Sequence, residues 1–152
     1  MKKQKLIMEQ LDRKIVKYKG LEEIITPPMG WIYSIRQALN MSLKQLGNRL
    51  SITPQSVREI EEREKNKTVS LKVLQQVAAA LDMNFVYGFI PKGYTLEKMI
   101  EKKANELATH IVQRTSINMS LEDQKNSDER INRAIEDKTE EIKNEVPKYI
   151  WD

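Results

Sequence analysis

The stretch at 42–61 predicts two short helices with almost no chain between them. Ser42, with Gln45 three residues later, fits a capping box at the start of the first helix. Thr53 followed by Pro54 fits the cap and the first position of the second helix. Only three residues remain to form the turn. Because each helix has one apolar stripe, the pair needs neighbouring helices to cover both stripes, so a lone helical hairpin is excluded.

Two further helices are expected beside this pair, at about 31–39 and 70–81, where apolar residues recur at helical spacing. Gly47 lies on the buried face of the helix that begins after Ser42, and its lack of a side chain lets the next helix cross closely. The inward-facing positions expected in the four helices are Trp31, Ile32, Ile35 and Leu39; Leu43, Leu46 and Leu50; Val57 and Ile60; and Leu71, Leu74, Val77, Ala78 and Leu81.

Helical spacing also occurs on the N-terminal side of this group. Residues 4–18 predict a helix that ends near Gly20, and Pro27-Pro28 prevents any continuation because proline lacks the amide donor. The apolar stripe expected on this helix consists of Leu6, Ile7, Leu11, Ile15 and Tyr18.

On the C-terminal side, residues 95–113 predict another helix, followed by a polar break at 115–120. Residues 121–146 predict an exposed amphipathic helix with a narrow stripe of isoleucines. An apolar end tag, Tyr149-Ile150-Trp151, is expected to dock either on the protein's own core or on a partner chain.

Residues 85–90 differ from the rest because they are aromatic and β-branched and stop at Pro91. Two interpretations remain open. The segment is an extended plug packed on the preceding helix, or it is one short strand that pairs with the same segment of another copy, since the chain offers no second good strand.

These patterns together predict an all-α fold with at most one short strand. We expect a core of five helices at about 31–90, an N-terminal arm helix and a C-terminal helical extension. The expected domain boundaries are 1–28 for the arm and connector, 29–92 for the core and 93–152 for the extension.

Composition and charge narrow the function. The chain has 152 residues, a net charge of +4 and no cysteine, which excludes a disulfide scaffold, a thiolate metal site and a cysteine nucleophile. Residues 1–90 hold 15 Lys/Arg and 9 Asp/Glu, whereas residues 91–152 hold 11 and 13. The excess of positive charge in the first part favours a polyanionic partner. No stretch is apolar enough to cross a membrane, and a cytoplasmic protein is expected.

Candidate catalytic and metal sites are weak. His110 is the only histidine, and no cluster of metal ligands surrounds it in the sequence. The acidic run Glu59, Glu61, Glu62 and Glu64 alternates with basic residues and is interpreted as solvated helix-end charge. No phosphate-binding glycine loop occurs. We therefore expect no enzyme activity, no metal and no cofactor.

The helix that begins at Pro54 has the residue types needed to read a DNA major groove. Glutamine pairs with adenine and arginine pairs with guanine through two hydrogen bonds each, and the N-terminal part of such a helix reaches the bases. The expected base-reading residues are Gln55, Ser56, Arg58 and Glu59. The expected phosphate-binding residues, at the starts of the two paired helices, are Ser42, Lys44, Gln45 and Thr53.

Residues 35–85, beginning Ile-Arg-Gln-Ala-Leu-Asn-Met-Ser-Leu-Lys-Gln-Leu-Gly, resemble the Cro/repressor-type (XRE) helix-turn-helix domain. That family usually has alanine where Gly47 stands and glycine where Ser51 stands. The resemblance implies double-stranded operator DNA as the partner and a homodimer as the active form. It also implies an ion pair between Arg36 and Glu61 that joins two helices of the core.

A narrower resemblance covers nearly the whole chain. Its motifs are Gln10-Leu11-Asp12, Pro27-Pro28-Met29-Gly30-Trp31-Ile32, Val86-Tyr87-Gly88-Phe89-Ile90-Pro91-Lys92 and Asn118-Met119-Ser120-Leu121-Glu122-Asp123-Gln124. These are similar to the family called mobile mystery protein A, whose members are typically encoded beside a Fic-domain protein. The resemblance implies a DNA-binding regulator that is the antitoxin-like half of a toxin–antitoxin pair.

The sequence leaves two functions open. The first is a sequence-specific DNA-binding repressor, and the second is a protein-interaction module that sequesters a toxin. The chain contains no copy of the inhibitory pattern Ser/Thr-x-x-x-Glu-Gly/Asn of Fic inhibitors. Any inhibition of a Fic enzyme would therefore use another contact.

Overall fold

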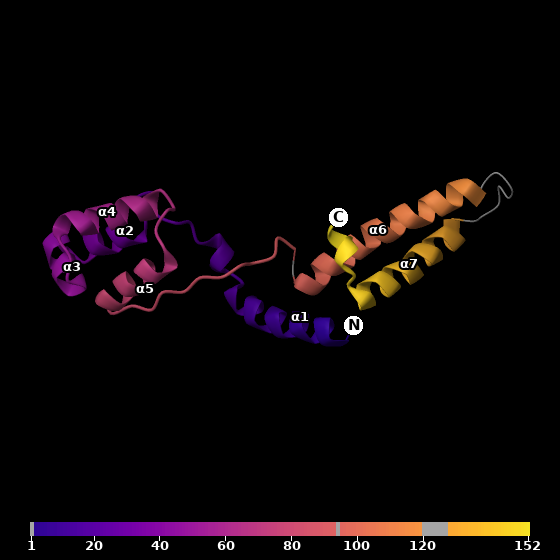
Figure 1. Ribbon diagram of the computed structural model, residues 1–152, viewed down its shortest axis with the longest axis horizontal. Helices are drawn as coiled ribbons and strands as arrows, with labels where there is room; N and C mark the ends of the chain where they lie inside the picture. Colours follow the sequence, from indigo (N-terminus) through magenta and orange to yellow (C-terminus); the bar gives the residue numbers. More distant parts are fainter. Residues whose placement is uncertain (1, 94, 120–127) are drawn as a thin grey trace. The chain divides into compact units, whose positions relative to one another are not determined.

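The structure is a computed structural model that describes residues 2–93, 95–119 and 128–152. The described residues form α-helices and short 3-10 helices with no strand, so the predicted all-α class is confirmed (Figure 1). The α-helices are α1 (Lys2–Ile15), α2 (Trp31–Ala38), α3 (Leu43–Leu50), α4 (Pro54–Lys65), α5 (Leu71–Ala80), α6 (Leu96–Met119) and α7 (Asp128–Glu145). The 3-10 helices are η1 (Val16–Tyr18), η2 (Leu21–Glu23) and η3 (Lys148–Trp151).

The chain divides into two compact units. The central unit is Gly20–Gly88, and the terminal unit combines Met1–Lys19 with Phe89–Asp152. The first and last parts of the chain therefore fold together, whereas the sequence suggested a separate arm and extension. The domain boundaries expected after residues 28 and 92 stay predictions.

Helix caps explain where the helices of the central unit begin. The Ser42 hydroxyl accepts a hydrogen bond from the Gln45 amide (3.0 Å), and the Gln45 side chain accepts one from the Ser42 amide (2.8 Å). This reciprocal pair is the predicted capping box. Thr53 caps α4 by accepting a hydrogen bond from the Ser56 amide, and Ser70 caps α5 by accepting one from the Val73 amide. Each cap satisfies an amide that has no partner within its own helix.

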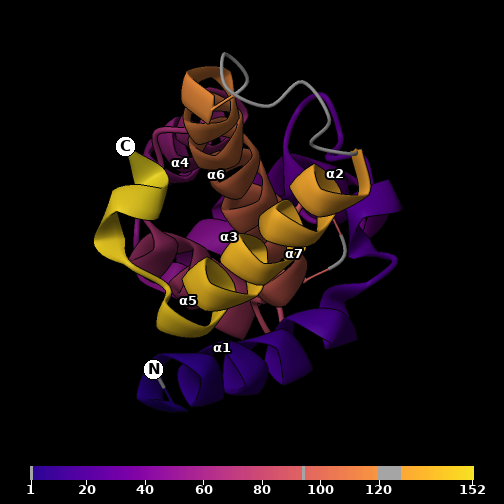
Figure 2. The same ribbon diagram turned by 90° about the vertical axis from the view of Figure 1, so that its right-hand side faces the viewer.

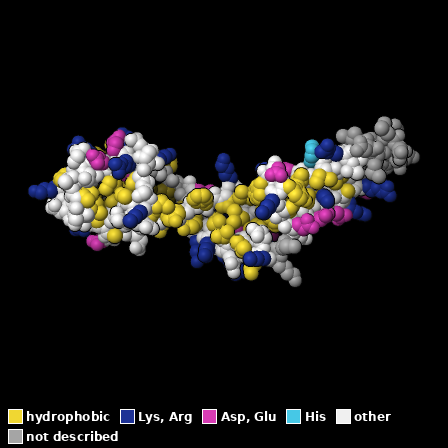
Figure 3. Space-filling view, viewed as in Figure 1, with side chains coloured by type: hydrophobic (Ala, Val, Ile, Leu, Met, Phe, Trp, Pro, Cys, Tyr) yellow, Lys and Arg dark blue, Asp and Glu magenta, His cyan; other side chains and the backbone are white. Residues whose placement is uncertain are grey.

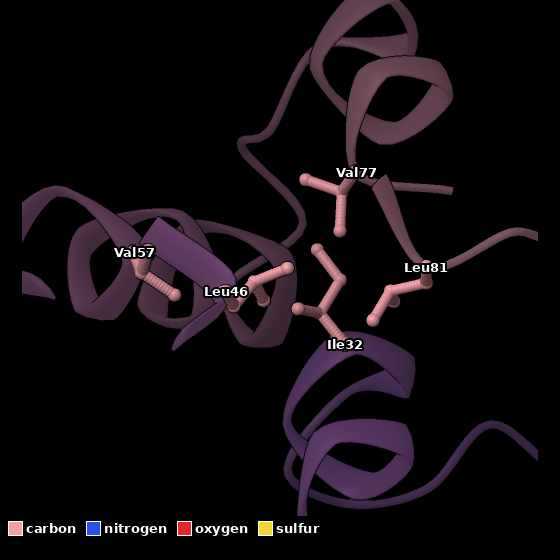
Figure 4. Close-up of a cluster of buried hydrophobic side chains, with 5 residues drawn as sticks. All are labelled: Ile32, Leu46, Val57, Val77 and Leu81. Carbon is pink, nitrogen blue, oxygen red and sulfur yellow. The ribbon is translucent and has the colours of Figure 1, made fainter. Parts of the chain in front are cut away.

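One small hydrophobic core holds α2, α3, α4 and α5 together. In Figure 4 the side chains of Ile32, Leu46, Val57, Val77 and Leu81 converge, and all are less than 9% exposed. Burying one such side chain contributes roughly 1.5–3 kcal/mol. Three predicted core residues, Trp31, Leu39 and Leu71, are instead more than 40% exposed. Trp31 and Leu71 are the first residues of their helices and Leu39 follows the last residue of α2, so they lie at the rim of the core.

The prediction of five helices in this core is wrong. The central unit contains four α-helices, and residues 81–93, all of them described, form no helix. Aromatic and β-branched residues at 85–90 favour extended backbone, and Pro91 cannot donate to a helical ladder. The segment is extended but has no strand partner in the described chain.

The terminal unit is built on the antiparallel pair α6 and α7, which lie side by side in both Figure 1 and Figure 2. Its core contains Ile100, Ala104 and Ala108 of α6, Ile142 of α7 and Ile150 of η3. The predicted break is wrong for residues 115–119, because α6 continues to Met119, and residue 120 lies outside the described residues. The described helix α7 is mostly exposed and has a narrow buried stripe, as predicted. Ile142 and Thr139 are buried because α6 covers this face; residues 121–127 of that prediction lie outside the described residues.

Helix α1 packs beside the start of α6 rather than standing free. The Asp12 carboxylate accepts hydrogen bonds from the amides of Leu96 (2.8 Å) and Glu97 (3.2 Å), so it caps α6 from another helix. Met8 packs against the terminal core, whereas the predicted stripe residues Leu6, Ile7 and Leu11 are at least 40% exposed. Ile15 and Tyr18 of the predicted stripe are partly buried, and Met8, which lies outside the stripe, packs against the terminal core.

The C-terminal end tag docks on the protein's own terminal core through one residue. Ile150 is buried there, while Tyr149 and Trp151 are more than half exposed. No described helix is long and apolar enough to span a membrane.

Candidate nucleic-acid interface

The turn between α3 and α4 is held by backbone contacts. The amide of Ile52 donates to the carbonyl of Gly47 (2.9 Å), and a Cβ at position 47 would lie 2.7 Å from the Ile52 carbonyl oxygen. That distance is too short for a side chain, so glycine is required here for close approach. The alanine that the XRE family usually has at this position would force the turn to shift.

Ser51 ends α3 in the left-handed conformation, with φ 58° and ψ 39°. This conformation costs an L-residue roughly 1–2 kcal/mol, and glycine adopts it freely. The position is the one where the XRE family usually has glycine. A serine therefore occupies a backbone conformation that favours glycine.

Helix α4 has a buried side and an exposed side. Val57 is 1% exposed and Ile60 is partly buried against the same core, which places Gln55, Arg58 and Glu59 on the exposed side. The side chains of these three residues make no hydrogen bond or ion pair with another described residue. Their side chains are therefore available to a ligand.

Ser56, the fourth predicted base-reading residue, lies differently. Its hydroxyl accepts a hydrogen bond from the Thr53 hydroxyl (2.9 Å), and its amide donates to the same Thr53 oxygen (3.1 Å). Ser56 is half-buried within this cap. Because it accepts only one bond, the Ser56 hydroxyl keeps its own hydrogen and one lone pair for another partner.

The predicted phosphate-binding residues are gathered at two helix starts. Ser42 and Gln45 are occupied with each other in the capping box, and Thr53 caps α4. Lys44 is exposed in the first turn of α3, and its ammonium group contacts no other described residue. Among the four, Lys44 is therefore the free charge, while the others order the helix ends whose amides can face phosphates.

An open groove of about 670 Å³ lies beside this exposed side. Lys44 of α3, Arg58 and Lys65 of α4, and Tyr33 and Gln37 of α2 are among its lining residues. Glu61 and Glu62 also line it. The groove therefore lies between α4 and the first turn of α3.

Helix α4 is fixed to α2 by a buried ion pair. Atom Nη2 of Arg36 lies 2.8 Å from Oε1 of Glu61, both residues are 7% exposed, and the Arg36 Nε donates to the same carboxylate at 3.1 Å. Nη1 of Arg36 donates to the Met41 carbonyl (3.0 Å), just before the α3 cap. The Tyr33 ring lies 5.5 Å from the Arg36 guanidinium carbon. One guanidinium therefore contacts α4 and the α2–α3 turn from α2.

A second carboxylate of α4, Glu64, was missed by the sequence interpretation. Its side chain accepts hydrogen bonds from the amides of Trp31 (3.0 Å) and Ile32 (2.7 Å) and so caps α2. The description of the acidic run as solvated charge is wrong for Glu64 and for Glu61, which is buried in the ion pair with Arg36. The available signal was Gly30, which precedes α2 and has no side chain to cap it.

In the part of the chain that is described, no group of His, Cys, Asp or Glu could hold a metal ion.

Comparison with known proteins agrees with this geometry. Residues 32–87 match the family model described as helix-turn-helix. Searches of curated proteins and of solved structures give no match. The matched range contains α3, the turn and α4, together with α5 and nearly all of α2. Residues 32–87 are therefore a helix-turn-helix domain of the XRE type, which is the domain of DNA-binding regulators.

Proposed function

We propose that the protein is a sequence-specific DNA-binding transcriptional regulator that binds double-stranded operator DNA as a homodimer. The observation that carries this proposal is the exposed side of α4. Gln55 and Arg58 project from its first turns, while Val57 and the Arg36–Glu61 pair anchor the opposite side.

The base-reading role follows from side-chain chemistry. Gln55 would bind N6 and N7 of adenine, and Arg58 would bind O6 and N7 of guanine, with Ser56 and Glu59 at neighbouring bases. Lys44 would neutralise a phosphate, and the capped starts of α3 and α4, with Ser42, Gln45 and Thr53, would hold the backbone. One recognition helix reads few base pairs. A homodimer solves this with two half-sites roughly 34 Å apart.

The experiment is a mobility shift at stated salt concentrations with the DNA upstream of the protein's own gene and a random duplex of equal length. We expect tighter binding to the upstream DNA, with a salt dependence that reports phosphate contacts. Equal affinity for both duplexes at every salt concentration would contradict sequence-specific regulation.

We also propose an antitoxin-like role beside a Fic-type toxin, in which the protein represses its own operon. The resemblance to mobile mystery protein A supports this role. Co-expression with the Fic-domain protein encoded next to the gene tests it. Relief of toxicity by the wild-type chain supports the role, and unchanged toxicity together with no co-purification contradicts it.

A second candidate function is sequestration of a toxin without sequence-specific DNA binding. The long charged pair α6 and α7 favours an added protein-binding role, because it belongs to the terminal unit and not to the helix-turn-helix domain. A variant with Gln55→Ala and Arg58→Ala separates the two functions. Toxin neutralisation that survives loss of DNA binding assigns it to sequestration.

A further inference from the structure

Residues 84–90 are an extended segment whose backbone is open. No backbone hydrogen bond joins them to any other described residue, although Met83 just before them still donates to Ala78. Their apolar side chains are exposed as well: Val86 by 67%, Tyr87 by 56% and Phe89 by 84%. Hydrophobic side chains are visible among charged ones on the face shown in Figure 3. An exposed, uncharged segment with free amides and carbonyls is a template for strand pairing.

The side chains of this segment already alternate as in a strand. The rings of Phe85 and Tyr87 stack with centroids 5.8 Å apart, so positions 85 and 87 share one side. Phe89 continues the same alternation by two residues, which gives three aromatic rings at every second position. Val86 and Gly88 belong to the other side. Pro91 ends the segment because it cannot donate to a ladder.

We propose that residues 84–90 pair with the same segment of a second copy as an antiparallel two-stranded ribbon, with Tyr87 on the two-fold axis. The inference rests on the proposed homodimer and assigns its contact. In this register Phe85 lies opposite Phe89 of the second copy, and Tyr87 lies opposite Tyr87. Every ring of one strand then faces a ring of the other, a favourable class of cross-strand pair.

Three features favour a second copy as the partner. The segment contains no charge, so two copies do not repel each other. Asp82 precedes it and Lys92 follows it, so antiparallel pairing brings opposite charges together at both ends. Its midpoint is Tyr87, so the segment covers itself completely and leaves Pro91 outside the ladder. An isologous contact of this kind also supplies the two-fold symmetry that paired recognition helices need.

The chain has no cysteine, so a single introduced cysteine reports the register directly. In the proposed ribbon, the two Cα atoms of residue 87 lie about 4.5–5.5 Å apart, which is within the range that a disulfide spans. The matched control is Phe89→Cys. Residue 89 faces residue 85 of the partner and lies more than about 10 Å from its own copy. Under mild oxidation we expect a disulfide-linked dimer from Tyr87→Cys and little from Phe89→Cys.

Light scattering of the unmodified chain gives a second measurement. We expect a mass near twice 17.8 kDa for the wild-type protein at micromolar concentration. Phe89→Asp should weaken the dimer at least tenfold because it places two carboxylates in the ribbon. Ile25→Asp is the matched control, since Ile25 is 88% exposed and lies outside the segment. It should leave the mass unchanged.

The proposal is overturned by a wild-type monomer, by a dimer that survives Phe89→Asp, or by equal crosslinking at positions 87 and 89. A monomer that binds its operator specifically overturns the ribbon and the homodimer, and leaves the proposal of sequence-specific DNA binding standing. A dimer that crosslinks at position 87 but binds all DNA alike supports the ribbon and overturns the proposed regulator.

Discussion

The carboxylate of Glu64 accepts a 2.7 Å hydrogen bond from the main-chain amide of Ile32, thirty-two residues earlier in the chain. The last turn of α4 thus supplies the helix cap that Gly30, which has no side chain, cannot provide to α2. The space is filled closely, because a Cβ at Gly30 would lie 2.8 Å from Oε1 of Glu64. Helices α4 and α2 are therefore joined at two points, by Glu64 and by the Arg36–Glu61 pair.

Removing this cap should destabilise the helix-turn-helix domain. Glu64→Ala leaves two α2 amides without their acceptor, and loss of a helix cap costs about 0.5–2 kcal/mol. Urea denaturation followed by circular dichroism measures the change. Glu62→Ala is the control, because Glu62 is exposed on the same helix and its side chain has no described partner. Equal stability of the two variants would contradict a capping role.

Breaking the buried ion pair should cost more. Arg36→Met leaves the Glu61 carboxylate buried without its partner, which typically costs about 3–5 kcal/mol. The double variant Arg36→Met with Glu61→Leu should regain much of this loss, because no unpaired charge remains. Arg49→Met is the control. Its ion pair with Asp82 and its hydrogen bond to the Ala80 carbonyl are both exposed, and exposed ion pairs contribute about 1 kcal/mol or less. An Arg36→Met variant as stable as Arg49→Met would contradict the assignment.

Ser51→Gly should stabilise the protein by about 1 kcal/mol, because glycine adopts the left-handed conformation of this position without the clash that a Cβ suffers. The thermal midpoint measures the gain. The same substitution at Ser70 is the control, since Ser70 has φ −78° and caps α5. Ser70→Gly should lower stability by a few tenths of a kcal/mol. A fall in stability with Ser51→Gly would show that the serine side chain makes a contribution that its backbone angles do not reveal.

Two single substitutions should separate base reading from phosphate binding. Gln55→Ala should weaken binding to the cognate site by about 1–3 kcal/mol and relax specificity there. Lys44→Ala should weaken binding to all sequences alike and reduce the salt slope by about 1. Fluorescence anisotropy on cognate and random duplexes at several salt concentrations measures both. If the two variants lose affinity equally on both duplexes, the assignment of roles is wrong.

Asp12→Ala should loosen α1 from the terminal unit, because the first amides of α6 lose a charged acceptor from another helix. We expect a cost of about 1 kcal/mol and faster hydrogen exchange in α1. Asp12→Asn should retain part of the cap through its side-chain oxygen. Glu9→Ala is the control, because Glu9 lies on the same helix and is exposed. Unchanged exchange in both variants would show that Met8 alone holds α1.

Local sequence signals determined the helix-turn-helix domain of this protein. Ser42, Thr53 and Ser70 act on amides within three residues of themselves, so their caps could be predicted without knowing what packs around them. The spacing of Leu46, Val57 and Val77 placed the core for a similar reason, since helical periodicity is a property of the chain alone. The exposed Gln55 and Arg58 followed from the same periodicity. The segment at 85–90 was recognised as extended because its side chains disfavour a helix.

Contacts between distant residues could only be decided by the tertiary structure. Asp12 and Glu64 carry no local mark of capping, because each accepts from amides far away in the sequence, and many other carboxylates of this charged chain could have been chosen. The burial of Ile142 depends on α6 lying beside α7, and the exposure of Leu11 depends on which edge of α1 meets α6. Periodicity defines an apolar stripe, but which part of the stripe is buried depends on the partner that covers it, and that partner is set by the packing of the whole chain.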